Sequence, residues 1–150
     1  NIPVIAAGGI ACGKTMAAAF ALGAEGVQIG SRFVASNESS AHINFKKAII
    51  NAVEGSTELT LKELTPVRLM KNKFYKDIQI AYNNNASSDE LKELLGRARA
   101  KNGMFNGDLI EGELEIGQIS SSINEIKPAK EIVKDIMSEF YHVINELKNL

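Results

Sequence analysis

Two glycine-containing segments near the amino terminus have the residue types that bind phosphate groups. Gly8-Gly9 closes a short apolar run, and Gly30-Ser31 closes a second one. Glycine lets backbone N–H groups approach a ligand closely, and the Ser31 hydroxyl adds one more hydrogen-bond donor. If the two runs are neighbouring parallel strands, both segments lie at the same edge of a sheet. The spacing therefore predicts a phosphate-binding site made mainly of backbone donors.

The first of these segments also matches a nucleotide-binding P-loop. Gly8-Gly-Ile-Ala-Cys-Gly-Lys-Thr15 fits the pattern G-x-x-x-x-G-K-[ST] between a strand and a helix. Lys14 would neutralise phosphates, and Thr15 would hold Mg²⁺. A nucleotide hydrolase also needs an aspartate at the end of a second apolar strand, whereas the second run ends in Gly-Ser-Arg. The P-loop is therefore the less favoured alternative, and a solvated Lys14 is the simpler interpretation.

The first thirty residues have the pattern of a βαβ unit. Pro3 to Ala7 is a β-branched apolar run, which predicts a strand buried on both faces of a parallel sheet. Residues 13–22 are predicted as a helix with Gly23 at its carboxyl end, and Gly26 to Gly30 as the second strand.

The remaining chain is predicted to be mostly helical. Gly103 to Ile123 is rich in glycine and is predicted as an ordered, irregular loop. We find no other strong strand signal, so the sheet must continue in a missing N-terminal segment or in a partner chain. The predicted helices cover residues 39–53, 60–64 with the capping box Thr60-x-x-Glu63, 73–82, 88–101 and 128–148.

The overall composition is that of an ordinary soluble globular domain, with 45% hydrophobic and 23% charged residues in 150. A net charge of −1 gives no reason to expect nucleic acid or an anionic membrane as partner. The single Cys12 cannot form an internal disulfide, which favours a cytoplasmic location. Because the chain begins with Asn1 and enters a strand at once, we expect a fragment or a processed piece.

No residue has the setting of a catalytic acid, a catalytic base or a metal ligand. His42 and His142 have no second histidine or cysteine at metal-ligand spacing, so no metal site is predicted. Cys12 has no identifiable base and is interpreted as an inert thiol. The carboxylates between Asp108 and Glu115 alternate with apolar residues, which predicts an exposed extended segment. Arg32 is interpreted as a partner in a structural ion pair.

The combined pattern resembles a known family of flavoenzymes. Residues 2–10 and 16–34 resemble the last two βα units of the nitronate monooxygenase family, formerly called 2-nitropropane dioxygenases. Flavin-type enoyl-acyl carrier protein reductases share this pattern, and weaker similarity continues through 66–72 and 107–118 to the final helix, so that it covers nearly the whole chain. The resemblance implies an α/β fold, the C-terminal part of a (β/α)₈ TIM barrel. Residues 1–54 would form the last two βα units, and residues 55–150 a mostly helical C-terminal extension packing on the barrel.

The resemblance also implies FMN as the cofactor and a small-molecule substrate. In the family, FMN oxidises an alkyl nitronate with O₂ to a carbonyl compound and nitrite, assisted by a histidine from an earlier strand. In the reductase branch, reduced FMN passes hydride to an enoyl thioester. A homo-oligomer or a missing N-terminal barrel half would complete the site. Residues implied at the site are Gly8, Gly9, Gly30 and Ser31 on the flavin phosphate, Gln28 beside them, and Gln118 at the flavin mouth.

Overall fold

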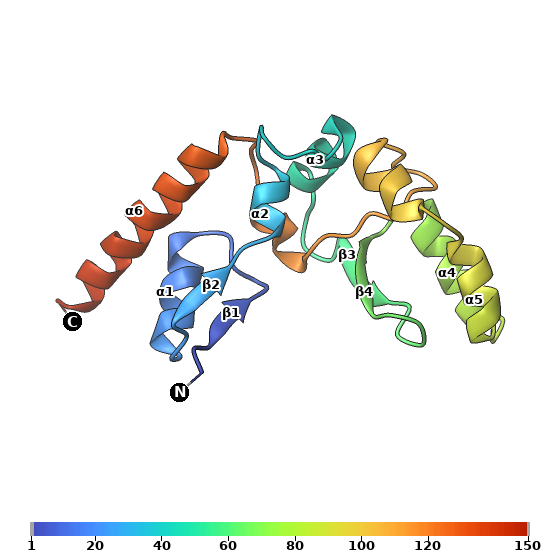
Figure 1. The fold of residues 1–150 in the computed structure, drawn as a ribbon, viewed down its shortest axis with the longest axis horizontal. Helices are drawn as coiled ribbons and strands as arrows, with labels where there is room; N and C mark the ends of the chain where they lie inside the picture. Colours follow the sequence, from blue (N-terminus) through green and yellow to red (C-terminus); the bar gives the residue numbers. More distant parts are fainter. Residues whose placement is uncertain (1, 150) are drawn as a thin grey trace.

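The chain forms an arch with two arms, as the computed structural model of residues 2–149 describes it (Figure 1). One arm contains the N-terminal βαβ unit and the long C-terminal helix, and the other contains a β-hairpin and two helices. The elements in chain order are β1 (Ile5–Ala7), α1 (Gly13–Ala21), β2 (Gly26–Gln28), α2 (Ser31–Val34), α3 (Ile43–Ile50), β3 (Thr57–Thr60), β4 (Val67–Met70), α4 (Lys73–Asn83), α5 (Ser88–Leu95), the π-helical turn η1 (Lys101–Phe105), the 3₁₀ helix η2 (Gln118–Ser122) and α6 (Ala129–Leu147).

The predicted βαβ unit is confirmed. β1 and β2 pair in parallel, with Ala7 opposite Gln28, so their carboxyl ends lie at the same edge. The prediction that the first strand is buried on both faces is wrong within this chain, because Val4 is 62% exposed and Ile5 is 53% exposed. Within residues 2–149 no other strand pairs with β1, and its sheet has two strands.

Helix α6 packs along α1 and is positioned there by a glycine. A Cβ atom at Gly13 would overlap the backbone of α6 at Ile136 and Phe140, so the two helices approach closely. The N–H group of Gly13 donates to the Glu139 carboxylate at 2.6 Å, and the rings of Phe20 and Phe140 are 5.4 Å apart. The C-terminal helix therefore packs on the first βα unit.

The predicted helix over 60–64 is wrong, because Thr57–Thr60 and Val67–Met70 form a β-hairpin that was not predicted. β3 and β4 pair in antiparallel, with Thr57 opposite Met70 and Thr60 opposite Val67. Glu115 bridges to Leu69 on the other edge of β4. Thr60 therefore ends a strand and is buried, because cross-strand pairing and burial outweigh the local capping pattern.

The other predicted helices are present with different ends. The helix predicted over 39–53 spans α3 only, and the helix predicted over 88–101 ends at Leu95. Gly96, with a φ of +65°, ends α5, and helical structure begins again with the π-helical turn η1. Of the irregular loop predicted over Gly103 to Ile123, residues 103–105 belong to η1 and residues 118–122 form η2, while most of the remainder is irregular. None of the helices within residues 2–149 combines the length and apolarity that crossing a bilayer requires.

Two apolar clusters hold the arch together. The first lies at its centre and joins residues from the N-terminal unit to the segment around η2, so both sides of the predicted boundary at residue 54 share one core. The second lies between the hairpin, α4 and α5. The buried members of the first are Ala11, Ala35, Phe45, Ile49, Leu114, Ile116 and Ile123; those of the second are Leu61, Leu69, Phe74, Ile78 and Leu91.

Candidate cofactor site

The glycines at the two strand ends leave their backbone open to a ligand. Gly8 and Gly9 have φ angles of +84° and +71°, which side chains disfavour, and Gly30 precedes the first turn of α2. At all three positions a Cβ atom would meet nothing within 4 Å. Because β1 and β2 run in parallel, these open backbone segments lie at one edge of the sheet. An anion can approach the backbone there without displacing other atoms.

Ser31 connects this edge to the loop that carries Gln118. Its hydroxyl oxygen accepts a hydrogen bond from the N–H group of Gly117 at 3.1 Å. The hydroxyl proton remains for donation to a ligand, because a serine hydroxyl both donates and accepts. A Cβ atom at Gly117 would lie 2.8 Å from this oxygen, so the contact requires glycine. Ser31 thus positions the start of η2 relative to the strand ends.

Gly9 and Gln118 line one cavity of about 540 Å³ between the two arms. Gln118 is exposed and is the first residue of η2. Gln28 is exposed at the end of β2 and is not part of this cavity's wall. The other residues that line the cavity are residues 53–57, Arg68, Ile119, Ser121 and Ser122.

Sequence reasoning missed Arg68 and the turn over 53–57 as parts of this wall. Arg68 lies in β4, and its Nη1 atom donates to the backbone oxygen of Thr57 at 3.2 Å and to its hydroxyl at 3.4 Å. The available signal was the apolar run Val67-Arg-Leu-Met70, which a single polar residue interrupts. That run has only four residues, too few for the pattern to stand out from the neighbouring helices.

The P-loop interpretation fits the structure poorly. The Thr15 hydroxyl donates to the Cys12 carbonyl oxygen at 2.9 Å and accepts from the amides of Ala11 and Cys12, so it caps α1. The amide of Gly13, which would face a phosphate, is bound by the Glu139 carboxylate. Lys14 is exposed on α1, as the simpler interpretation predicted.

The remaining polar candidates lie in structural contacts or on the surface. Arg32 is buried and donates to the backbone oxygen of Glu125 at 3.1 Å, while burial lowers the pKa of its guanidinium. His42 caps α3 by accepting from the Asn44 amide at 3.1 Å, and His142 is exposed. Residues 2–149 contain no group of three or more His, Cys, Asp or Glu side chains placed to bind a metal ion.

The acidic segment between Asp108 and Glu115, predicted as an exposed extended segment, is partly buried. Glu113 is only 8% exposed, because the segment packs between the hairpin and η1. Burial, and then the neighbouring charge of Glu115, raises the pKa of its carboxyl group. The Asp108 carboxylate accepts from the backbone amides of Glu111 and Ile110, which lowers its pKa. Both carboxylates therefore act within the fold.

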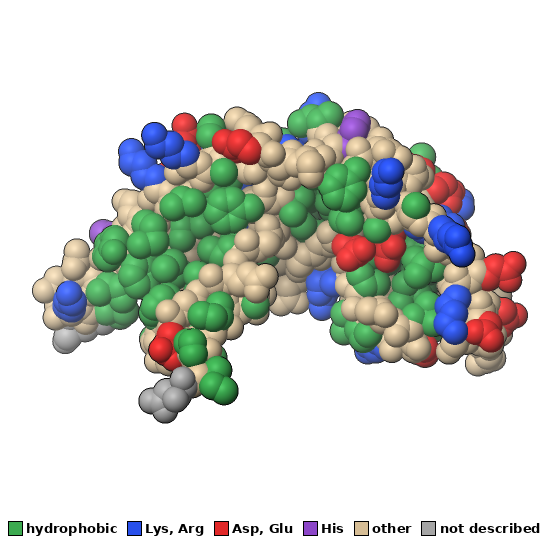
Figure 2. Space-filling model, in the orientation of Figure 1, with side chains coloured by type: hydrophobic (Ala, Val, Ile, Leu, Met, Phe, Trp, Pro, Cys, Tyr) green, Lys and Arg blue, Asp and Glu red, His purple; other side chains and the backbone are tan. Residues whose placement is uncertain are grey.

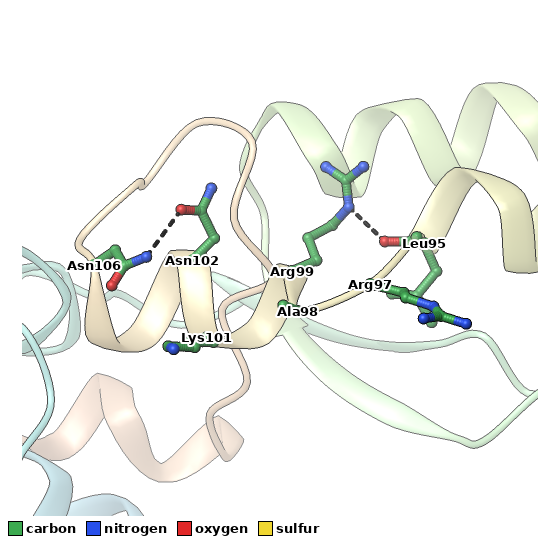
Figure 3. Close-up of a pocket in the computed structure, with 8 residues that line it drawn as sticks. Leu95, Arg97, Ala98, Arg99, Lys101, Asn102 and Asn106 are labelled. Carbon is green, nitrogen blue, oxygen red and sulfur yellow. Dashed lines mark hydrogen bonds between the residues drawn. The ribbon is translucent and has the colours of Figure 1, made fainter.

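A second polar cavity, of about 480 Å³, lies between the end of α5 and η1 (Figure 3). Its central arginine, Arg99, donates to the carbonyl oxygens of Leu94, Leu95 and Glu111 at 2.7–2.9 Å. Figure 3 shows this side chain directed at Leu95. Arg99 therefore satisfies the last carbonyl groups of α5, and its role is structural.

Comparison with known proteins gives the same family that the sequence pattern indicated. The family model described as nitronate monooxygenase matches residues 1–139. A probable nitronate monooxygenase of Staphylococcus saprophyticus is 31% identical over 147 residues, which are 97% of this chain and 41% of that protein. A probable nitronate monooxygenase of Bacillus subtilis is 50% identical over 60 residues, which are 40% of this chain and 17% of that protein.

Two solved structures are similar over nearly the whole chain. FabK from Thermotoga maritima is 42% identical with a TM-score of 0.87, and the match covers 99% of this chain and 47% of FabK. A nitroalkane oxidase from Streptomyces ansochromogenes is 29% identical with a TM-score of 0.77, covering 97% of this chain and 41% of that enzyme. The chain thus spans less than half the length of these relatives. It has their α/β fold, and it belongs to the nitronate monooxygenase family.

Proposed function

We propose that the protein carrying this chain is an FMN-dependent oxidoreductase that oxidises alkyl nitronates. One observation carries the proposal: the parallel pairing of β1 and β2, which brings the open backbone at Gly8, Gly9 and Gly30 to one edge. The Ser31 hydroxyl is a fourth donor at that edge. A hydrogen bond to a charged group contributes about 1.5–3 kcal/mol, so three or four such bonds would hold a flavin phosphate firmly.

The proposed fold is the last part of a (β/α)₈ barrel, with β1–α1 and β2–α2 as its final two βα units. The exposed apolar surface supports this arrangement, because Val4, Ile5 and Leu22 are 53–90% exposed around β1 and α1. Figure 2 shows hydrophobic side chains over this arm of the arch. The neighbouring strands and helices of a barrel would cover such a surface. Residues 55–150 would then be the extension that packs on the barrel.

The strand-end glycines and the two glutamines have different proposed roles. FMN, when bound, would supply the redox chemistry, which converts an alkyl nitronate and O₂ to a carbonyl compound and nitrite. The backbone donors at Gly8, Gly9 and Gly30 would bind the phosphate and so fix the position of the ring system. Gln28 would face the flavin from β2, and Gln118 would contact the flavin or the substrate across the cavity. We also propose that the protein is located in the cytoplasm.

A second candidate is reduction of an enoyl thioester, the activity of the reductase branch. The observation that favours it is the 42% identity to FabK, compared with 29% to the nitroalkane oxidase, over almost the same residues. The two reactions differ in the direction of electron flow through the flavin. Nitronate would reduce it in the first, and a reduced nicotinamide would reduce it in the second.

The absorption spectrum of the purified protein, in the form its gene encodes, tests the proposal. We expect the bands of oxidised flavin and release of FMN on denaturation. Anaerobic bleaching of these bands by a nitronate would support the first reaction, whereas bleaching by NADH or NADPH alone would support the second. A colourless protein that cannot be reconstituted with FMN would contradict both.

A further inference from the structure

The cavity between the two arms contains a cation that the proposed flavin site does not use. Arg68 lines this cavity together with Gly9 and Gln118. Glu54 also lines it, but lies exposed on the turn before β3.

Pairing on both sides fixes the backbone of Arg68. On one side, Arg68 pairs with Leu59 of β3. On the other side, the Arg68 carbonyl oxygen accepts a hydrogen bond from the Ile116 amide at 3.1 Å. The next residue, Leu69, is buried in the second apolar cluster. Because side chains alternate along a strand, the Arg68 side chain emerges on the opposite face, toward the cavity.

Arg68 is half-buried and makes no ion pair within residues 2–149. Residues 2–149 provide two acceptors, both on Thr57 and both for Nη1, and no carboxylate oxygen within 4.0 Å. Glu58, on the neighbouring strand, is near enough for its charge to act on Arg68, but its carboxylate pairs with Lys71 at 3.0 Å. The guanidinium of the buried Arg32, by contrast, lies 3.9 Å from the Glu125 carboxylate. Partial burial of an unpaired charge is unfavourable, and an anion in the cavity would remove that cost.

We infer that Arg68 binds the anionic group of the substrate, as a residue that determines specificity for planar oxyanions. Arginine offers five donors in a planar fork that matches two oxygens on one atom. A nitronate has this geometry, with two oxygens on one nitrogen and one negative charge. The inference rests on the proposed nitronate chemistry. It places the substrate on the Arg68 side of the cavity, because the FMN phosphate is assigned to the strand ends.

Steady-state kinetics of the holoenzyme with R68Q and R68K test this inference. We expect R68Q to raise KM about 10- to 100-fold for an alkyl nitronate, with no change for the neutral nitroalkane of the same carbon skeleton. R68K, which keeps the charge but loses the fork, should lie between the wild type and R68Q. The dissociation constant for FMN should be unchanged in both variants. Arg97, an exposed arginine outside this cavity, gives the matched control R97Q, for which we expect the wild-type KM.

Nitronate binding measured by calorimetry decides the inference independently of turnover. If the wild-type protein holds no flavin, the proposed function fails, but weaker nitronate binding by R68Q than by R97Q still supports the role of Arg68. An R68Q protein that unfolds at the wild-type temperature and binds nitronate equally well would overturn the inference. So would a loss of FMN affinity in R68Q with unchanged KM, which would assign Arg68 to the flavin phosphate.

Discussion

Replacement of the buried Lys46 by methionine should destabilise the protein strongly. Lys46 lies in α3 and is 6% exposed, and its ammonium donates to carbonyl oxygens of Ser36 at 2.6 Å, Ser39 at 2.8 Å and Asn37 at 3.3 Å. These carbonyl groups belong to the turn that follows α2. The side chain therefore fixes the path of the chain just after the proposed phosphate site.

The magnitude follows from these contacts. Two short hydrogen bonds to a charged group contribute about 1.5–3 kcal/mol each, and methionine leaves the carbonyl groups without their donor. Relief from burying an ammonium offsets part of this loss. We expect K46M to lower the free energy of unfolding by about 3 kcal/mol. With a urea m-value of about 2 kcal/mol/M, the unfolding midpoint would fall by about 1.5 M.

Urea unfolding followed by circular dichroism measures this shift. The matched control is K47M, because Lys47 is the next residue of the same helix and is exposed. An exposed substitution of this kind should change stability by less than about 0.5 kcal/mol. Equal midpoints for K46M and the wild type, or equal losses in K46M and K47M, would refute the structural role of the Lys46 ammonium.

Three further substitutions test the packing around the site. G13A should cost about 3 kcal/mol by thermal unfolding, because its Cβ would overlap the α6 backbone; a stability equal to wild type would show that α6 does not pack there. S120A should be neutral or stabilising within about 1 kcal/mol, since the buried Ser120 hydroxyl has no partner among the described residues, and a large loss would reveal a missing contact. E113Q should stabilise the protein at pH 7. Because the pKa of Glu113 is raised in the folded state, its contribution to stability is present below the unfolded pKa of about 4.3 and is lost as pH rises through the folded pKa. Equal gains in stability from E113Q at pH 4 and at pH 7 would contradict this reasoning.

The sequence was sufficient for the parts of the fold that depend on local pattern. The βαβ unit follows from two apolar runs separated by a helical pattern, and each run ends in glycine. The hairpin could not be predicted in the same way, because β3 and β4 have four residues each and the Thr60–Glu63 spacing also fits a helix start. The helix break at Gly96 was missed because its flanks continue the helical pattern.

Some residues of the candidate site could be predicted from local pattern and others could not. The strand-end glycines carry a local signal, so sequence alone could nominate them. The direction of Arg68 depends on pairing with residues near Ile116, far along the chain, and no local pattern encodes it. The burial of Lys46 and Glu113 is likewise set by tertiary packing, since both residue types are usually exposed.

FMN titration of the apoprotein, comparing G30L with K14A, tests whether the glycines at the strand ends bind the flavin phosphate. A Cβ atom at residue 30 would meet nothing within 4 Å, so we expect the fold to tolerate leucine there while the larger side chain blocks the approach of a phosphate. We predict that G30L weakens FMN binding at least tenfold and that K14A binds FMN as tightly as the wild type. Unchanged FMN affinity in G30L would contradict the proposed flavin site. So would a wild-type protein that binds ATP but not FMN and loses that binding in K14A.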